Sequence, residues 1–469
     1  MTIMKKAAYM TVQKKMHLTS LGCAKNLVDS EIMLGSLERK GYRTVADPAE
    51  AELLLINTCG FIRPAVEEAV DEILRLAEYK QEDPTKKLVV TGCLVQRYGK
   101  DLQDELPEVD FFVGIDEEQE IASLLERWSP GDSSLFLQGP SCSLIKSNMP
   151  RRLATPFFRS YLKITEGCNN RCTYCMIPAI RGNLRSRAVQ DLLLEAQALE
   201  RGGVKELCLI AQDLTAYGDD SDDPETGDNL VSLLKRLLVV TYIPLLRLLY
   251  LYPSSVSVEL LELMAEQPRI LPYLDIPFQH VSDPVLQGMG RRYGQQELEQ
   301  LIAMIRRILP GCSLRSTMMV GFPGETEKDL ENLLDCLQRW RLDHLGVFPY
   351  EAEQGSLAAD LPGQPAKEIR EERYARVMEL QAAISAQRLE QYAGKKETVL
   401  VEGLSRETEL LLEGRTRYQA PDIDGCVLIN EGTPHPGDIL TVDITEGHTN
   451  YLLGGIIHKL FPTAPTTSC

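Results

Sequence analysis

The segment EGCNNRCTYC, residues 166–175, carries three cysteines whose spacing suits metal chemistry. Cys168, Cys172 and Cys175 are separated by three and then two residues, and no fourth cysteine or histidine follows in the local run. Thiolates are soft ligands for iron–sulfur clusters or zinc, and a structural zinc site is closed by four ligands. Three thiolates on a four-iron, four-sulfur cluster leave one iron open for a substrate or cofactor. The spacing therefore favours such a cluster, with zinc or plain packing thiols as the alternatives.

Three further cysteines, Cys23, Cys59 and Cys93, each end an apolar stretch that is followed by a helical pattern. Residues 16–125 repeat this rhythm, which is typical of a parallel sheet with helices on its faces. All strands of a parallel sheet end at one edge, and ligands bind outside that edge. We therefore expect these three thiols to meet in space. Buried structural cysteines are the alternative.

Residues 156–391 continue the strand–helix rhythm on a longer scale. Strands are expected at 161–165, 206–212, 245–252, 272–278, 313–321 and 343–350, with helices at 188–202, 228–240, 256–267, 294–309, 327–341 and 366–391. Six such units predict an incomplete (β/α)6 barrel, whose functional residues lie on the loops after the strands. The segment 166–175 follows the first of these strands.

The remaining parts of the chain are predicted from composition. Residues 126–155 are rich in Ser, Pro and Gly and are predicted to be a linker. Residues 392–469 hold short β-rich runs, which predict a small antiparallel barrel of OB-like type. Residues 1–15 lack a clear pattern and are predicted to be a disordered extension.

The chain has 469 residues, 12 cysteines and a net charge of −18. That charge argues against a large nonspecific nucleic-acid surface, and it fits either a basic partner or plain solubility. No signal peptide is evident, and the most apolar run, 233–253, contains Lys235, Arg236 and Arg247. We therefore expect a cytoplasmic protein with reduced cysteines and no membrane span.

The cysteine loop, with Tyr174 just before its last cysteine, resembles the radical S-adenosylmethionine (SAM) enzymes. LGCAKNLVDSE (21–31), NTCGFI (57–62) and VTGCL (90–94) resemble the amino-terminal domain of methylthiotransferases, and EGCNNRCTYCMIPAIRGNLRSR (166–187) resembles their radical SAM segment. The β-rich tail is similar to their TRAM domain. The resemblance covers the chain after Met16.

The resemblance implies two four-iron, four-sulfur clusters, each with one open iron. The cluster of Cys168, Cys172 and Cys175 would cleave one SAM to a 5′-deoxyadenosyl radical. The cluster of the other three cysteines would supply or carry the inserted sulfur, and a second SAM would donate a methyl group to that sulfur. The product would carry a methylthio group where a C–H bond was. An electron donor such as flavodoxin or ferredoxin is implied as well.

Several residues at or near strand ends are candidates for contacts with SAM or substrate. We expect Tyr174 to line the adenine, with simple packing as its alternative. Gln212, Asp213, Arg315 and Ser316 could bind the SAM carboxylate, its ribose or the substrate, although Arg315 could instead be a buried ion-pair partner. Gly321 belongs to a turn that could let the backbone approach adenine.

Within this family the chain resembles the RimO branch, which modifies the β-carbon of an aspartate in small-subunit ribosomal protein S-twelve. The signals include IAQDLTAYG (210–218), PYLDIPFQH (272–280) and LRSTMMVGFPGET (314–326). The alternative is the branch that modifies an adenosine in tRNA. Between Arg388 and Cys469 there are 7 Lys and Arg against 12 Asp and Glu. An acidic tail suits a basic protein substrate, so we do not expect direct RNA binding.

Overall fold

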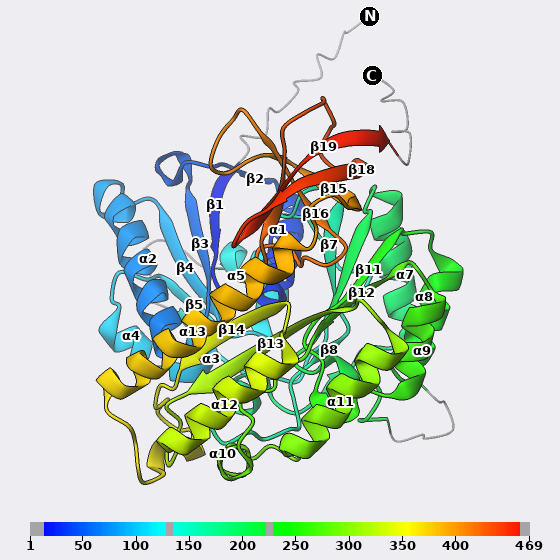
Figure 1. Cartoon of the computed structure of the whole chain (residues 1–469). Coiled ribbons are helices and arrows are strands. Elements are labelled where there is room, and N and C mark those ends of the chain that lie inside the picture. Colours follow the sequence, from blue (N-terminus) through cyan, green and yellow to red (C-terminus); the bar gives the residue numbers. More distant parts are fainter. Residues whose placement is uncertain (1–13, 128–134, 222–227, 460–469) are drawn as a thin grey trace, which may run out of the picture. The chain divides into compact units, whose positions relative to one another are not determined.

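The computed structural model describes residues 14–127, 135–221 and 228–459, and the chain divides into two compact units. The first unit extends to Ala154 and also includes Ala179–Gly182, a short segment that follows the cysteine loop in the sequence. The second unit comprises Thr155–Pro178 and everything from Asn183 onward. Each unit is described by itself below (Figure 1).

The first unit is built on a parallel sheet with the strand order β2-β1-β3-β4-β5-β6. The strands are β1 (Lys14–Ser20), β2 (Tyr42–Thr44), β3 (Leu53–Thr58), β4 (Lys87–Gly92), β5 (Phe111–Val113) and β6 (Leu135–Leu137). The helices are α1 (Ala24–Arg39), α2 (Arg63–Glu82), α3 (Cys93–Tyr98), α4 (Asp101–Glu105) and α5 (Ile121–Arg127), with short 3-10 turns η1 (Pro48–Glu50) and η2 (Glu117–Glu120).

Alternate residues of the central strands enter two separate hydrophobic cores, because successive side chains of a strand point to opposite faces. Leu54 and Ile56 of β3 pack with α2, α3 and α4, whereas Leu53 and Leu55 pack with α1 and α5. Figure 1 shows these two groups of helices on the two sides of the blue and cyan strands. The sheet is therefore covered on both faces, as the apolar stretches predicted.

Two parts of the first unit differ from the sequence expectation. Strand β6 lies inside the segment 126–155, which was predicted to be a linker, and it extends the sheet beside β5. Lys14 and Lys15 begin β1 and pair with β2, so they are not part of a disordered extension. The rest of that predicted extension lies outside the described residues.

The second unit begins with a six-stranded parallel sheet in the order β14-β13-β12-β11-β10-β7. Its strands are β7 (Arg159–Lys163), β10 (Glu206–Ile210), β11 (Leu245–Leu248), β12 (Ile270–Asp275), β13 (Ser313–Val320) and β14 (His344–Pro349). Each strand pairs with the next in sequence, which is the arrangement of an open (β/α)6 barrel. The predicted fold class is confirmed here.

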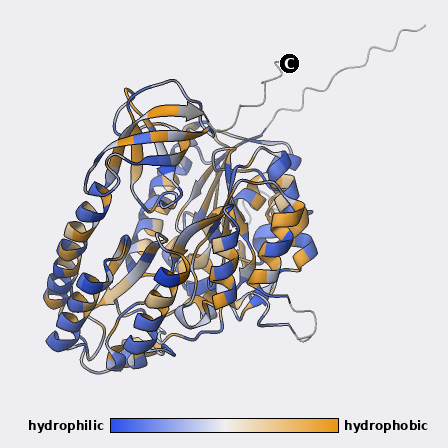
Figure 2. Cartoon of the chain, turned by 45° about the vertical axis from the view of Figure 1, so that its right-hand side comes forward, coloured by the Kyte–Doolittle hydropathy of each residue, from blue (hydrophilic) through white to orange (hydrophobic). Residues whose placement is uncertain are grey.

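Helices follow these strands along the outside of the curved sheet (Figure 1). They are α7 (Val189–Arg201), α8 (Leu230–Val240), α9 (Val258–Glu266), α10 (Asp283–Gly288), α11 (Gln295–Ile308), α12 (Glu327–Trp340) and α13 (Lys367–Glu390). Helix α6 (Ile177–Arg181) is divided between the units, since its residues from Ala179 onward are assigned to the first. Short 3-10 turns are η3 (Leu214–Ala216), η5 (Pro253–Ser255) and η6 (Leu357–Asp360). Local side chains start several helices: Asn229, Ser257 and Thr326 each accept a backbone N–H of the first turn. Figure 2 shows the mixed hydrophilic and hydrophobic residues of the long helices, as expected for elements with one buried face.

The carboxyl-terminal part of the second unit is a closed five-stranded barrel in the order β15-β16-β17-β19-β18. Its strands are β15 (Lys396–Leu404), β16 (Leu412–Thr416), β17 (Cys426–Ile429), β18 (Ile439–Gly447) and β19 (Tyr451–Lys459). The neighbours pair antiparallel except β17 and β19, which are parallel. The expected OB-like barrel is therefore present, with one parallel pair added to the antiparallel pattern.

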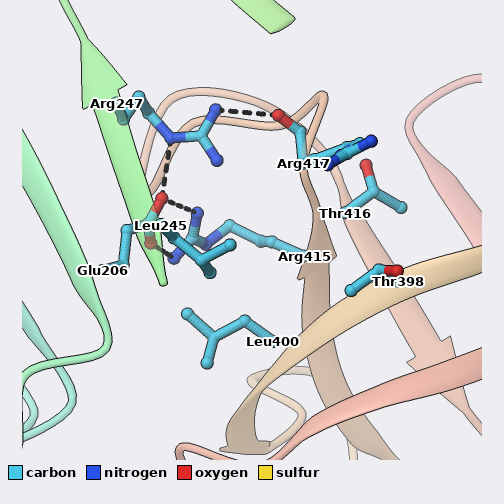
Figure 3. A pocket seen from close by; sticks show the side chains of 8 residues that line it. All are labelled: Glu206, Leu245, Arg247, Thr398, Leu400, Arg415, Thr416 and Arg417. Atoms are coloured by element: carbon cyan, nitrogen blue, oxygen red, sulfur yellow. Dashed lines mark hydrogen bonds and ion pairs between the residues drawn. The ribbon is translucent and has the colours of Figure 1, made fainter. Parts of the chain in front are cut away.

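Buried charges join this small barrel to the (β/α)6 barrel. The Glu206 carboxylate, fully buried at the start of β10, accepts hydrogen bonds from Arg415 of β16 at 2.5 Å and from Arg247 of β11 at 2.7 Å. Arg415 also contacts Glu402 of β15 at 2.8 Å. Glu206, Arg247 and Arg415 line a cavity of about 30 Å³ (Figure 3). The two barrels thus share a polar contact in which each charge has a partner.

In the described part of the chain, no helix is both long and apolar enough to cross a membrane.

Candidate active site

The cysteine loop of the second unit leaves the barrel directly after β7. The two-residue strands β8 (Thr165–Glu166) and β9 (Arg185–Ser186) pair antiparallel and close the base of this excursion. Gly167 has φ +73°, a left-handed conformation that glycine adopts without steric cost. A second turn brings the amide of Cys175 to within 3.1 Å of the Cys172 carbonyl. The loop therefore holds its three thiols along a short, tightly turned backbone.

Contacts from other barrel elements fix this loop in place. The Thr173 amide donates to the Met289 carbonyl at 3.0 Å, and its hydroxyl donates to the Gly288 carbonyl at 2.8 Å. The Ala358 amide donates to the Thr173 carbonyl at 2.9 Å. The loop is thus held between the end of α10 and the turn η6, so its position follows from the barrel and not only from its own sequence.

Strained backbone gathers at the same edge of the barrel. Arg171, Tyr250 and Gln279 have positive φ values of 51°, 67° and 70°, which non-glycine residues adopt at an energetic cost. They lie in the loops that follow β7, β11 and β12. Such strain is maintained only where surrounding contacts enforce it, and it concentrates at functional sites.

Two of the predicted contact residues are brought to the cysteine loop. The Asp213 carboxylate accepts a hydrogen bond from the Asn170 amide at 2.7 Å and also caps the turn η3. The Gln212 amide donates to Glu166 at 3.0 Å. The Gln212 carbonyl oxygen is buried without a hydrogen-bond partner among the described residues. It is therefore an acceptor available to a ligand beside the loop.

Tyr174 and Gly321 lie near one hydrophobic cluster. Tyr174 packs with Met319 against a core that contains Phe322, the residue after Gly321. Gly321 has φ +73°, and its amide donates to the Glu325 carboxylate. A Cβ at this position would lie 2.3 Å from the Arg370 side chain, so only glycine fits. Tyr174 therefore packs against this cluster, and its contact with the adenine of SAM stays a prediction.

Arg315 and Ser316 are not brought to the cysteine loop. Arg315 is the third residue of β13, opposite the first residue of β14, and therefore lies toward the amino-terminal end of the strands. It is ion-paired at 2.7 Å with Asp424, which is buried in the loop between β16 and β17. The Ser316 hydroxyl bonds the backbone of Ile276 and Phe278. The side chains of both residues therefore have partners within the protein. Arg315 is an ion-pair partner, which is the alternative that the sequence left open.

The cysteines of the first unit follow three neighbouring parallel strands. Cys23 precedes α1, Cys59 follows β3, and Cys93 begins α3 directly after β4. Each thiol acts electrostatically on another: Cys23 and Cys59 both raise the pKa of Cys93, and Cys23 raises that of Cys59. The three thiols are therefore close enough to act on one another, as predicted for residues at one edge of a parallel sheet.

Arg181 is a buried cation in the same neighbourhood that the sequence analysis did not single out. Its guanidinium donates to Asn26 Oδ1 at 2.6 Å and pairs with the Asp29 carboxylate at 3.1 Å. Asn26 Oδ1 also lies 3.5 Å from the Cys93 sulfur. No local signal in the sequence separates Arg181 from a solvated arginine, because its partners come from α1.

The three thiols of the first unit differ in acidity. Desolvation alone would raise the pKa of Cys23, but the cations Lys25 and Arg181 outweigh it and lower the pKa of this thiol. Burial raises the pKa of Cys59, and it raises that of Cys93 to about 12. In the second unit, burial raises the pKa of Cys168 and brings that of Cys175 to about 12. Bound iron would be needed to hold the more buried thiols as thiolates.

The cysteine sets differ from a binding site for a single metal ion. Among the described residues, no three His, Cys, Asp or Glu side chains converge on a single point as ligands of one metal ion do. In a four-iron, four-sulfur cluster each thiolate binds its own iron, so the sulfur atoms need not converge. Three neighbouring thiols without a histidine therefore fit a cluster better than zinc.

Comparisons with known proteins divide the chain as the fold does. The model of Uncharacterized protein family UPF0004 matches residues 15–114, that of the Radical SAM superfamily matches 162–337, and that of the TRAM domain matches 393–457. The structure of the radical SAM methyltransferase TsrM from Kitasatospora setae has a TM-score of 0.53 at 16% identity, covering 71% of this chain and 72% of that one. At this identity the likeness concerns the fold alone.

Curated relatives are similar to this chain over nearly its full length. The ribosomal protein uS12 methylthiotransferase RimO of Desulfotalea psychrophila is 52% identical over 94% of this chain and 99% of its own length. The protein of the same name from Pelobacter propionicus is 46% identical over 95% of this chain and 98% of its own. The chain therefore belongs to the RimO family of uS12 methylthiotransferases, within the radical SAM superfamily.

Proposed function

We propose that this protein transfers a methylthio group to ribosomal protein uS12, at the β-carbon of an aspartate. The observation that carries the proposal is the family membership over nearly the full chain, together with two sets of three cysteines at the ends of parallel strands. The relatives named above act on uS12, which favours the ribosomal protein over a tRNA adenosine as substrate. Since the substrate is a ribosomal protein, we place the enzyme in the cytoplasm.

The cofactors of this reaction are two four-iron, four-sulfur clusters and SAM. We assign Cys168, Cys172 and Cys175 to the cluster that works with SAM, and Cys23, Cys59 and Cys93 to the second cluster. When bound, these groups supply a radical that removes hydrogen from carbon, together with the sulfur and the methyl group that replace it.

The protein's own residues position the cofactors. We propose that Gln212 offers its partnerless carbonyl oxygen to SAM, while Asp213 fixes the cysteine loop through Asn170. Tyr174 and the backbone at Gly321 line the apolar side of the same space. Arg315 and Ser316 are left out of this assignment because their partners lie elsewhere.

The surface charge of the small barrel suggests the kind of protein that it binds. The small barrel exposes acidic side chains, among them Glu407, Glu409, Glu431, Asp443 and Glu446. An acidic surface attracts a basic ribosomal protein and repels RNA, so we propose that this TRAM domain contributes to binding uS12. A one-electron donor of the flavodoxin or ferredoxin class completes the system.

The test is anaerobic reconstitution with iron and sulfide, followed by reduction and addition of SAM. A uS12 peptide and an unmodified tRNA pool are offered in parallel and analysed by mass spectrometry. We expect a methylthio gain on the peptide aspartate that is lost in Cys172→Ala and in Cys59→Ala but retained in Cys142→Ala, whose cysteine is exposed and belongs to neither set. A gain on tRNA alone would refute the assignment to uS12.

A further inference from the structure

Arg291, in the loop between α10 and α11, is a cation enclosed by aromatic rings. Its guanidinium carbon lies 5.9, 5.1 and 5.9 Å from the ring centres of Tyr174, Tyr252 and Tyr293. One nitrogen donates to the Tyr174 hydroxyl at 2.6 Å, and Nε is buried without a hydrogen-bond partner. Within the described ranges, Arg291 forms no ion pair with a carboxylate. Its positive charge is thus not balanced by an acidic side chain.

The surrounding tyrosines do not balance this charge either. Tyr174, Tyr252 and Tyr293 carry phenol groups, which are ordinarily neutral at physiological pH. Their rings attract the guanidinium through the quadrupole of the π system, but they carry no net negative charge.

Arg291 is linked to the cysteine loop through Tyr174. Tyr174, which receives its hydrogen bond, stands between Cys172 and Cys175 in the sequence. The hydrogen bond and the ring contact with Tyr174 hold the guanidinium beside the loop whose thiols are proposed to bind the radical-generating cluster.

The other cysteine set has a different electrostatic setting. Its buried arginine, Arg181, is paired with the Asp29 carboxylate at 3.1 Å, and a second cation, Lys25, acts on Cys23. A paired cation contributes a much weaker field than one without a counter-charge. The two proposed clusters thus differ in the fixed charge beside them.

We propose that Arg291 is a positioning residue that sets the reducibility of the cluster bound by Cys168, Cys172 and Cys175. This inference rests on the proposed function. One electron from a low-potential donor makes the cluster and its thiolates more negative by one charge, while the donor loses that electron. A half-buried cation without a counter-charge stabilises the reduced form more than the oxidised form, because the local dielectric constant is below that of water. Arg291 therefore raises the reduction potential at the site where an electron must be accepted.

The test is a mediated redox titration of the full-length chain, followed by electron paramagnetic resonance. Cys23, Cys59 and Cys93 are replaced by Ala in every protein so that only the radical-generating cluster is observed. Arg291→Met removes the charge and keeps an apolar stem. We expect the ratio of reduced to oxidised cluster at a fixed potential to fall at least tenfold, which equals about 59 mV for a one-electron couple.

Arg291→Lys keeps the charge, so we expect its potential to lie closer to that of the parent than to that of Arg291→Met. Arg291→Gln replaces the Met variant if the latter does not fold. Arg292→Met, at the exposed neighbouring position, should leave the potential unchanged. An unchanged potential in Arg291→Met, or equal shifts in the Met and Lys variants, would overturn the role of the charge. If the parent binds no cluster at all, the proposed function fails instead, and the absence of a visible iron–sulfur spectrum reveals this.

Discussion

At the scale of single residues, the first unit holds three thiols of very different acidity at one sheet edge. Two cations, Lys25 and Arg181, stand beside Cys23 and lower its pKa against the effect of desolvation. At Cys93 desolvation outweighs the lowering by Arg181, and the pKa rises to about 12. Only the thiolate binds iron or reacts as a nucleophile. We therefore expect Cys23 to be the first of the three to engage an iron atom during assembly.

This difference can be measured by alkylating the metal-free protein with iodoacetamide and quantifying each cysteine by mass spectrometry. Because a lower pKa yields thiolate at lower pH, the rate at Cys23 should rise at lower pH than the rates at Cys59 and Cys93. Lys25→Met removes the largest positive influence on Cys23 and should move its curve to higher pH. Lys40→Met, at the far end of α1, serves as the control. If the pH dependence of alkylation at Cys23 were unchanged in Lys25→Met, the electrostatic explanation would be contradicted.

At the scale of secondary structure, the cysteines are placed by the turns that end the strands. Gly92 ends β4 and immediately precedes Cys93, with φ +100° and ψ −159°. This region of backbone conformation is open only to glycine. A Cβ at Gly92 would lie 2.3 Å from Asn57 Oδ1 and 2.5 Å from the Thr58 carbonyl oxygen. The close approach of β3 and β4 at this point brings Cys59 and Cys93 together.

Gly92→Ala should therefore destabilise the first unit by about 3 kcal/mol or more, since the strain of the backbone adds to the collision. Gly41→Ala is a matched control: its φ of +87° is also positive, but nothing lies within 4 Å of the added Cβ. It should cost about 1–2 kcal/mol. Thermal unfolding and the iron content of proteins lacking the other three cysteines give the two readouts. Equal losses in both variants would show that the collision at Gly92 is relieved by movement.

The sequence predicts the strands and helices around both cysteine sets well, because buried parallel strands are continuous apolar runs. β3, whose six residues are all buried, and α12, with its capping box at Thr326, are examples. The three-residue strands β2 and β6 are not predictable in this way, since they are held only by pairing with a neighbour. Arg181 and Arg291 were missed for a similar reason: their partners are far away in the sequence.

At the scale of the whole chain, the second unit is held together by charges shared between its two barrels. Asp424 of the small barrel accepts from Arg315 at 2.7 Å and from Tyr273 at 2.8 Å, while Arg415 reaches Glu206. The small barrel therefore inserts charged residues among the strands of the larger one. We infer that the acidic TRAM domain is oriented with respect to the (β/α)6 barrel by these contacts.

The contribution of these ion pairs between the two barrels can be tested at Glu206, whose side chain is fully buried. Burial alone would raise its pKa, but Arg415 and Arg247 outweigh burial and hold the pKa at about 2, below the ordinary 4.5. The carboxylate thus stabilises the folded state fully above pH 4.5, and this contribution is lost as the pH falls toward 2. Glu206→Gln leaves two buried guanidinium groups with less charge compensation and should cost about 3–5 kcal/mol near neutral pH.

The measurement is the midpoint of thermal unfolding across pH for the parent, Glu206→Gln and Glu259→Gln. Glu259 pairs with Lys235 on the surface, with more than half of each side chain exposed, so its loss should cost less than about 1 kcal/mol. The gap between the parent and Glu206→Gln should narrow as the pH falls below 4.5, because the parent's own carboxylate then begins to lose its advantage over the unfolded state. A gap that stays constant with pH would mean that the variant acts through packing, and the two barrels would then not be held by the charge of Glu206.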